Sequence, residues 1–128
     1  MKELTKAEEQ VMLILWKIEK GFVKDILQEF PAQRPAYNTI STIVRILEKK
    51  EFVGHRAYGK THQYFPLITK REYAKSYLRG FLSGYFSNSY KKLVSFFSKE
   101  SNLSIEEMEE IKALIEAQID KQKGNTNP

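Results

Sequence analysis

Apolar residues recur at helical spacing in the first part of this chain of 128 residues. Thr5 followed three residues later by Glu8 forms a capping box, so we expect a first helix to begin there. Gly21 then provides a natural end for it. A shorter repeat over residues 23–30 predicts a second helix, which Pro31 ends. The inward positions of the first helix are Ala7, Val11, Ile14, Leu15 and Ile18.

Residues 37–50 predict a third helix with two contrasting faces. At 100° per residue, apolar side chains at positions 40, 43, 44 and 47 share one face. A solvated helix face usually carries long Glu, Lys and Gln side chains, because Ser, Thr and Asn compete for backbone hydrogen bonds. Here the outward face is compact and nearly free of acid, which suits close contact with a partner, although a solvated surface explains it too. It carries Asn38, Ser41, Thr42, Arg45 and Lys49.

Aromatic and branched residues from position 52 to 67 predict two strands. Gly59 and Lys60 lie between them, and a Gly-X pair favours a two-residue turn of type II′. Three helices followed by a hairpin with a basic tip is the element order of a winged helix-turn-helix domain. In that fold the third helix enters the DNA major groove and the hairpin, or wing, contacts phosphate. The candidate DNA-binding residues are Asn38, Thr39, Ser41, Thr42, Arg45, Lys49, Arg56 and Lys60.

The second half of the chain predicts three more helices, over residues 70–86, 90–97 and 105–121. Capping boxes begin the first and last of these at Thr69 and Ser104. Their apolar stripes exceed what helices beside a small domain can hide, so we expect a second copy of the chain to cover them. An internal core or a ligand pocket is the alternative. The candidate dimerisation residues are Tyr73, Tyr77, Phe81, Tyr85, Ile111 and Ile115.

The expected fold class is therefore mainly α with a small β-hairpin. Residues 1–68 form a winged-helix DNA-binding domain, residues 69–123 a helical dimerisation region, and residues 124–128 a flexible tail. Because Trp16 lies on an amphipathic helix, we expect it in the core or at a domain contact.

The distribution of charge supports a polyanionic partner. The net charge is +5, and residues 36–70 and 71–100 each carry six basic and two acidic residues. Residues 101–128 carry three basic and six acidic ones. A basic middle of this kind suits duplex DNA, although basic proteins without such partners exist.

Composition and motifs exclude several classes of function. The chain has no cysteine, which rules out a disulfide framework and a cysteine nucleophile. We find no nucleophile–base pair and no phosphate-binding glycine loop, so we expect neither an enzyme nor a cofactor. His55 and His62 fall diagonally on one hairpin face if Tyr58 pairs with Thr61, but two such ligands without a nearby acid do not favour a metal site.

No apolar run is long enough to cross a bilayer, and we expect a cytoplasmic location.

Short motifs spread over most of the chain carry a family resemblance. They are Leu4-Thr5, Ala7-Glu8, Val11-Met12, Leu15-Trp16, Val23-Lys24-Asp25-Ile26, Thr39-Ile40 with Thr42, and Tyr64-Phe65-Pro66-Leu67. In this order and spacing they resemble the bacterial penicillinase repressor family, often called the BlaI/MecI type. The resemblance implies a homodimeric repressor that binds a palindromic operator. It also implies a membrane sensor metalloprotease that triggers cleavage within the dimerisation region.

The chain departs from the family pattern at several positions. Arg45-Ile46-Leu47 places the arginine one position earlier than the family's Arg-Leu pair, and Glu51 stands where the family often has glycine. Phe96 and Phe97 occupy the position of the family's scissile Asn-Phe bond, so alignment alone suggests cleavage there. The copper-responsive branch carries a cysteine motif that this chain lacks.

Two alternatives come from other functional classes. The same winged-helix face could bind a protein partner instead of DNA. The aromatic and basic segment from Tyr73 to Phe97 could bind a membrane surface.

Overall fold

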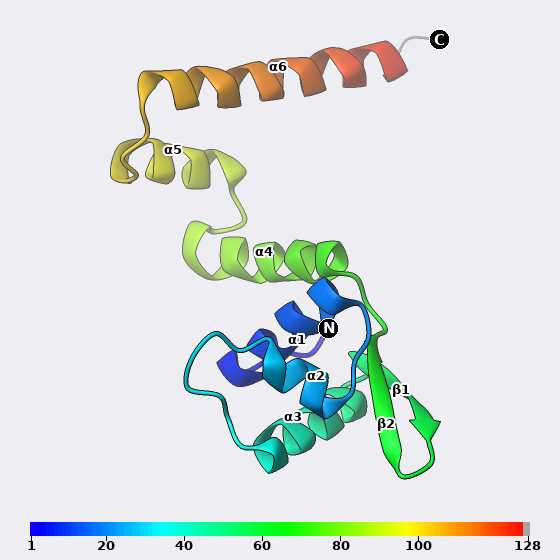
Figure 1. The fold of residues 1–128 in the computed structure, drawn as a ribbon. Helices are drawn as coiled ribbons and strands as arrows, with labels where there is room; N and C mark the ends of the chain where they lie inside the picture. Colours follow the sequence, from blue (N-terminus) through cyan, green and yellow to red (C-terminus); the bar gives the residue numbers. More distant parts are fainter. Residues whose placement is uncertain (127–128) are drawn as a thin grey trace. The chain divides into compact units, whose positions relative to one another are not determined.

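The computed structural model describes residues 1–126, which form helices and one two-stranded antiparallel sheet (Figure 1). The chain divides into two compact units, residues 1–78 and the residues from 79 onward. The division falls inside the fourth helix, whereas the sequence placed its boundary at residue 68. The elements are α1 (Lys6–Ile18), α2 (Val23–Gln28), α3 (Tyr37–Lys49), β1 (Val53–Tyr58), β2 (Thr61–Pro66), α4 (Lys70–Phe86), α5 (Tyr90–Glu100) and α6 (Ile105–Thr126).

The three capping boxes form as the sequence predicts. The Thr5 amide donates to Glu8 Oε1 over 2.9 Å, and the Glu8 amide donates to Thr5 Oγ1 over 3.2 Å. The same reciprocal pairs open α4 at Thr69 and α6 at Ser104. α6 continues to Thr126 and so includes the first residues of the segment expected as a tail, because the chain reaches no proline before position 128. Residues 127–128 of that tail lie outside the described residues.

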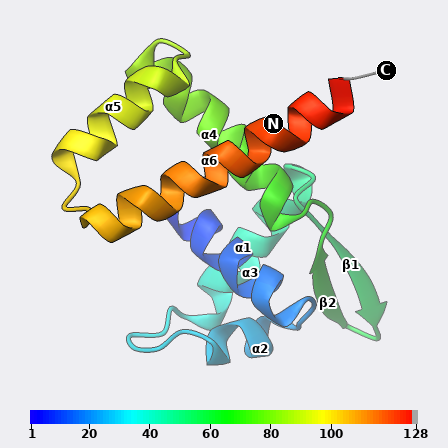
Figure 2. The same ribbon diagram turned by 90° about the horizontal axis from the view of Figure 1, so that it is seen from above.

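The core of the first unit is a single apolar cluster shared by α1, α2, α3 and the hairpin. Figures 1 and 2 show α1 and α2 packed on α3, with the hairpin beside them. The aliphatic face of α3 is buried completely at Ile40, Val44 and Leu47. Because this face is buried, the opposite, polar face of α3 points toward solvent. The whole cluster consists of Val11, Met12, Leu15, Val23, Ile26, Phe30, Ile40, Val44, Leu47, Phe52, Val53 and Tyr64.

Gly21 joins the helices to the wing rather than ending α1. The first helix already ends at Ile18, and Glu19 takes the positive φ of 72°. Gly21 exchanges two backbone hydrogen bonds with Tyr64, of 2.9 and 2.8 Å. A Cβ atom at Gly21 would meet Ile18 Cδ1 at 2.8 Å and Asp25 Cβ at 3.2 Å, so a larger residue here would make these side chains shift.

The wing has the register expected from its turn. Tyr58 pairs with Thr61, and Gly59 has the positive φ of 62° that the Gly-X turn requires. The register then aligns Ala57 with His62 and His55 with Tyr64, which places both histidines on one face of the hairpin.

The first turns of α4 belong to the first unit. The Trp16 indole Nε1 donates to the Ile68 carbonyl over 2.9 Å, and the rings of Trp16 and Phe52 both contact Tyr73. The Tyr73 hydroxyl donates to Glu9 over 3.1 Å. Burial and this hydrogen bond raise the pKa of Tyr73 to about 12. The structure thus places Tyr73, expected on a dimer surface, in the packing of the first unit, and it places Trp16 at the contact the sequence suggested.

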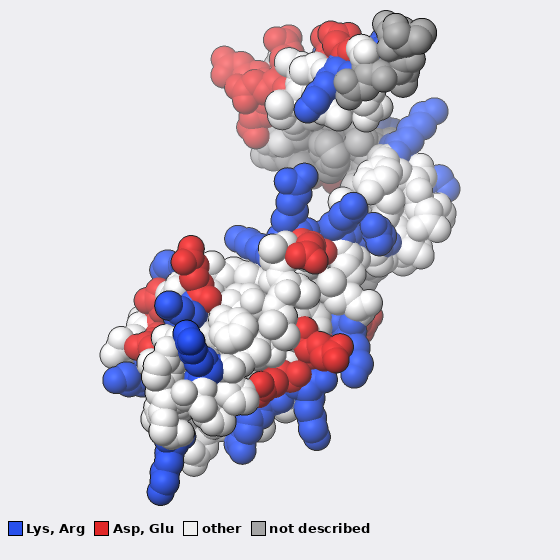
Figure 3. Space-filling model, turned by 90° about the vertical axis from the view of Figure 1, so that its right-hand side faces the viewer, with Lys and Arg blue, Asp and Glu red and all other residues white. Residues whose placement is uncertain are grey.

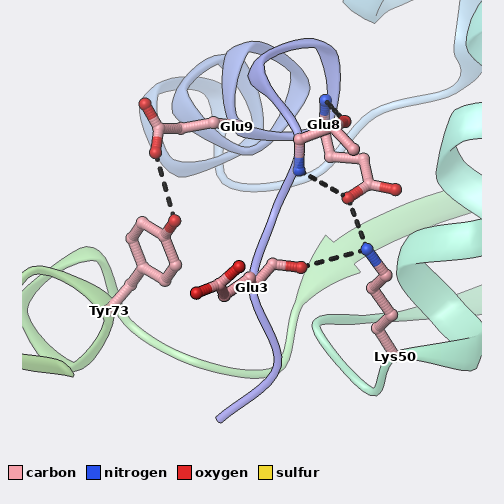
Figure 4. A network of polar contacts seen from close by, with 6 residues as sticks. Glu3, Glu8, Glu9, Lys50 and Tyr73 are labelled. Carbon is pink, nitrogen blue, oxygen red and sulfur yellow. Dashed lines mark hydrogen bonds and ion pairs between the residues drawn. The ribbon is translucent and has the colours of Figure 1, made fainter. Parts of the chain in front are cut away.

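A buried ion pair ties the end of α3 to α1 and the N-terminal segment (Figure 4). Lys50 Nζ lies 2.6 Å from Glu8 Oε1 and also donates to the Glu3 carbonyl over 3.0 Å. Burial alone would raise the pKa of Glu8. The hydrogen bonds from Lys50 and Thr5, with the charge of Lys50, outweigh burial and lower the pKa. The pair therefore stabilises the fold at pH values above the ordinary pKa of a glutamate. This contribution is lost as the pH falls through the lowered pKa that Glu8 has in the folded state.

We expect Lys50→Met to lower the free energy of unfolding by about 1–3 kcal/mol at pH 7, because it leaves the Glu8 carboxylate buried without its cation. Urea unfolding followed by circular dichroism measures this. Lys112→Met is the matched control, since the Lys112–Glu116 pair is exposed and separated by 4.0 Å. Between about pH 5 and pH 3 the wild type should lose stability faster than Glu8→Gln. Equal losses from both lysine variants would contradict this account.

Candidate nucleic-acid interface

The outward face of α3 is open to a partner along its length. The side chains at 38, 39, 42, 45 and 49 are exposed, and Ser41 is half-buried. Ala36 precedes this helix and gives it no side-chain cap, unlike the capped α1, α4 and α6. The first amides of α3 therefore lack a side-chain acceptor and, together with the helix dipole, favour a negative charge placed there.

A groove, here called the α3 groove, lies between α2, α3 and the wing. Three of the described residues that line it are basic, Lys24, Arg45 and Lys60, and none of the described lining residues is acidic. Figure 3 shows Lys and Arg side chains along the lower edge of the first unit, the end where Figure 1 places α3 and the wing tip. The full lining is Phe22, Val23, Lys24, Tyr37, Ser41, Arg45, Lys60, Thr61, His62 and Tyr64.

Arg45 is held along its own helix. Its Nε donates to the Ser41 carbonyl over 3.2 Å, which leaves the terminal guanidinium nitrogens for an external acceptor. Tyr64 packs beneath the groove, and burial raises the pKa of its hydroxyl, with Glu48 adding to the effect and Arg45 opposing it. Tyr64 is therefore neutral, and the positive charge of the groove comes from its basic residues.

The structure brings together only part of the set proposed from sequence. Ser41, Arg45 and Lys60 line the α3 groove, whereas Arg56 does not. Neighbouring residues of a strand point to opposite faces, and Arg56 lies between His55 and Ala57, so it occupies the other face of the hairpin.

Seven of the groove residues are absent from the set proposed from sequence, among them the polar residues Lys24, Tyr37 and His62. Lys24 could have been found, because Val23 and Ile26 face the core and leave Lys24 outward at the start of α2. Whether Tyr37 and His62 line the groove depends on the distance between α3 and the wing, and no local sequence pattern predicts that distance.

The two histidines form a stacked pair. Their ring centroids are 4.1 Å apart and the ring planes differ by 7°. Within residues 1–126, no group of three or more His, Cys, Asp or Glu side chains is placed to hold a metal ion. The helices of the same described range include none with the length and apolar character needed to cross a membrane.

The second unit exposes large apolar side chains. Tyr85 is 77% exposed, Leu114 72% and Phe96 54%. Of the predicted dimerisation residues in this unit, Phe81 and Ile115 are also exposed and Ile111 is half-buried, while Tyr77 is exposed in the first unit. A small shallow hollow in this unit is lined by Val94, Phe97, Ser98, Met108, Ile111, Lys112, Ile115 and Glu116.

The first part of the chain is a winged-helix domain, because it has three helices followed by a hairpin, and its third helix presents a polar face beside a basic groove. Further helices follow this domain. A sequence model of the penicillinase repressor family matches residues 4–117. The chain therefore belongs to this family, which confirms the resemblance read from its motifs. Members of the family are repressors and not enzymes, as expected from the sequence.

The individual relatives are of modest identity. The methicillin resistance regulatory protein MecI of Mammaliicoccus sciuri is 27% identical over 114 residues, covering 88% of this chain and 93% of MecI. The penicillinase repressor of Bacillus licheniformis is 25% identical over 122 residues, covering 94% and 95% of the two chains. The solution structure of the DNA-binding domain of the repressor BlaI matches with a TM-score of 0.49 and 27% identity, covering 57% of this chain and 94% of that domain.

The two faces of α3 should respond differently to truncation. We expect Ile40→Ala to lower the free energy of unfolding by about 2–5 kcal/mol, because it opens a cavity in the core. Asn38→Ala and Thr42→Ala should change it by less than about 0.5 kcal/mol, because both side chains are exposed. Chemical denaturation of the three variants tests the orientation of the helix. A large loss in Thr42→Ala would mean that this face is covered within the protein.

Proposed function

We propose that the chain is a homodimeric transcriptional repressor that binds a palindromic DNA operator, with one winged-helix domain on each half-site. The observation that carries this proposal is the α3 groove, whose basic and acid-free lining adjoins an exposed helix face of short polar side chains. Family membership supports the same conclusion. Half-sites for such dimers lie one or more helical turns apart, about 10 bp centre to centre per turn.

Side-chain length and charge suggest which residues contact bases and which contact phosphates. Asn38, Thr39, Ser41 and Thr42 are short enough to bring the N-terminal half of α3 close to base edges in the major groove. Arg45 reaches a guanine or a phosphate beside them. Lys60 at the wing tip contacts phosphate, which contributes affinity but little sequence preference.

Lys49 and Arg56 complete the proposed set as outer contacts. Lys49 is exposed in the last turn of α3, where a cation can meet the duplex backbone. Arg56 lies on the hairpin face away from the α3 groove, so we assign it a peripheral phosphate contact that depends on the path of the duplex.

Footprinting on DNA upstream of the chain's own gene should identify the operator, because repressors often control their own promoter. On that operator, we expect Thr42→Ala or Arg45→Ala to weaken binding by about 1–3 kcal/mol and to affect random duplex much less. Lys60→Ala should weaken binding to every sequence alike and reduce the salt slope by about one. Fluorescence anisotropy at several salt concentrations measures both effects.

Two outcomes decide against parts of this proposal. Equal losses on all sequences from Thr42→Ala and Arg45→Ala would remove base readout by α3. Salt-insensitive or absent binding to any duplex would favour the alternative, a winged-helix module that binds protein.

We propose dimerisation through the exposed apolar side chains of the helical second unit. Tyr85, Phe81 and Ile115 are large exposed apolar side chains of the kind that a second copy of the chain can cover. We expect Ile115→Glu to raise the dimer dissociation constant at least tenfold, or about 1.4 kcal/mol. Glu109→Lys is the matched control, since at 100° per residue exposed Glu109 lies about 120° from Ile115 and about 160° from Ile111 around α6. Sedimentation equilibrium compares them, and a monomeric wild type would refute the dimer.

We propose that repression ends by cleavage between Phe96 and Phe97, triggered by a membrane sensor protease. Alignment with the family motivates the position, and Phe96 is exposed. The bond lies inside α5, so a protease needs this helix to open locally before it can cleave. N-terminal sequencing of fragments from derepressed cells should find Phe97 as a new terminus. A full-length chain throughout derepression would exclude cleavage.

A further inference from the structure

We propose that His62 is a phosphate contact of the DNA interface and that it takes up a proton when duplex DNA binds. This inference rests on the proposed function and adds to it a residue and a pH dependence. It starts from the position of His62 in the wall of the α3 groove, beside Arg45 and Lys60. Within the described part of the chain, no hydrogen bond or ion pair engages the ring of His62, so its nitrogens are available to a ligand.

A chain of contacts fixes this ring relative to α3. His55 Nδ1 lies 2.5 Å from Glu48 Oε2, and because a carboxylate only accepts, this nitrogen donates. His55 stacks in turn on His62 in parallel planes. Glu48 belongs to α3, His55 to β1 and His62 to β2, so these contacts link α3 to the strand that carries His62.

The charged groups near His55 differ from those near His62. Glu48 is the anion at His55, and it compensates a positive charge on that ring. His62 shares the lining of the α3 groove with Lys24 from α2, Arg45 from α3 and Lys60 from the wing, and with Tyr37 and Tyr64. No acid is among the described lining residues, so a positive charge on His62 lacks a compensating anion until one arrives from outside.

Duplex phosphates supply the missing anion. A protonated imidazole forms a charge-assisted hydrogen bond to phosphate, whereas the neutral ring forms a weaker one. DNA binding and protonation of His62 therefore favour each other, as thermodynamic linkage requires. Imidazole is the side chain that changes charge between pH 5 and pH 8, and His55 and His62 are the two histidines of this chain, which has no cysteine.

The test measures affinity for a fluorescent duplex of random sequence by anisotropy, at fixed low salt, from pH 8 to pH 6. We expect the wild-type association constant to rise as the pH falls, by up to tenfold per pH unit for each proton taken up, which is up to a hundredfold for a dimer that takes up one proton per protomer. His62→Gln should remove most of this rise, whereas His55→Gln, which keeps the groove-facing ring, should retain at least part of it. Thermal unfolding verifies that each variant is folded.

A second measurement uses the wild type alone. In NMR spectra the ring protons of the two histidines, assigned with the variants, report their titration midpoints with and without duplex. The His62 midpoint should move to higher pH on binding, and further than that of His55. An unchanged His62 midpoint, or a pH dependence that survives in His62→Gln, overturns the inference while leaving DNA binding intact. A wild type that binds no duplex at any pH instead refutes the proposed function on which the inference rests.

Discussion

The burial of one face of α3 is the constraint on which the rest of the first unit depends. Ile40, Val44 and Leu47 have no exposed surface, and each is held by side chains from other elements. A helix buried along one side cannot rotate without exposing that side to water, at a cost of about 1.5–3 kcal/mol for each large aliphatic residue. Burial of the aliphatic face therefore fixes the direction in which the polar face points.

The other features of the first unit preserve this orientation. Lys50 ties the end of α3 to Glu8 of α1 and to the backbone at Glu3. Gly21 and Tyr64 join the segment after α1 to the wing by two backbone hydrogen bonds. The residues of the ion pair lie outside the lining of the α3 groove, whereas Tyr64 of the bridge is part of it. Both contacts help to hold α3 and the wing in a constant position relative to each other.

Local sequence signals were sufficient for most of the fold. Thr5, Thr69 and Ser104 each marked a helix start, because a capping box involves only neighbouring residues. Gly59 marked the turn for the same reason, since one positive φ decides it. Gly21 was misread as a helix end, because its actual role depends on Tyr64, which lies far along the chain. Tyr73 was assigned to an outer stripe for a similar reason, since Trp16 and Phe52 are its distant neighbours.

Trp16 has a practical consequence that follows from its place in the fold. It is the single tryptophan of the chain, its indole is hydrogen bonded to the Ile68 backbone, and its ring lies against Tyr73. The segment it touches leads directly into α4, the helix that continues into the second unit. Its ultraviolet emission is thus an intrinsic, label-free reporter of whether that helix remains anchored, a property that can be followed in real time.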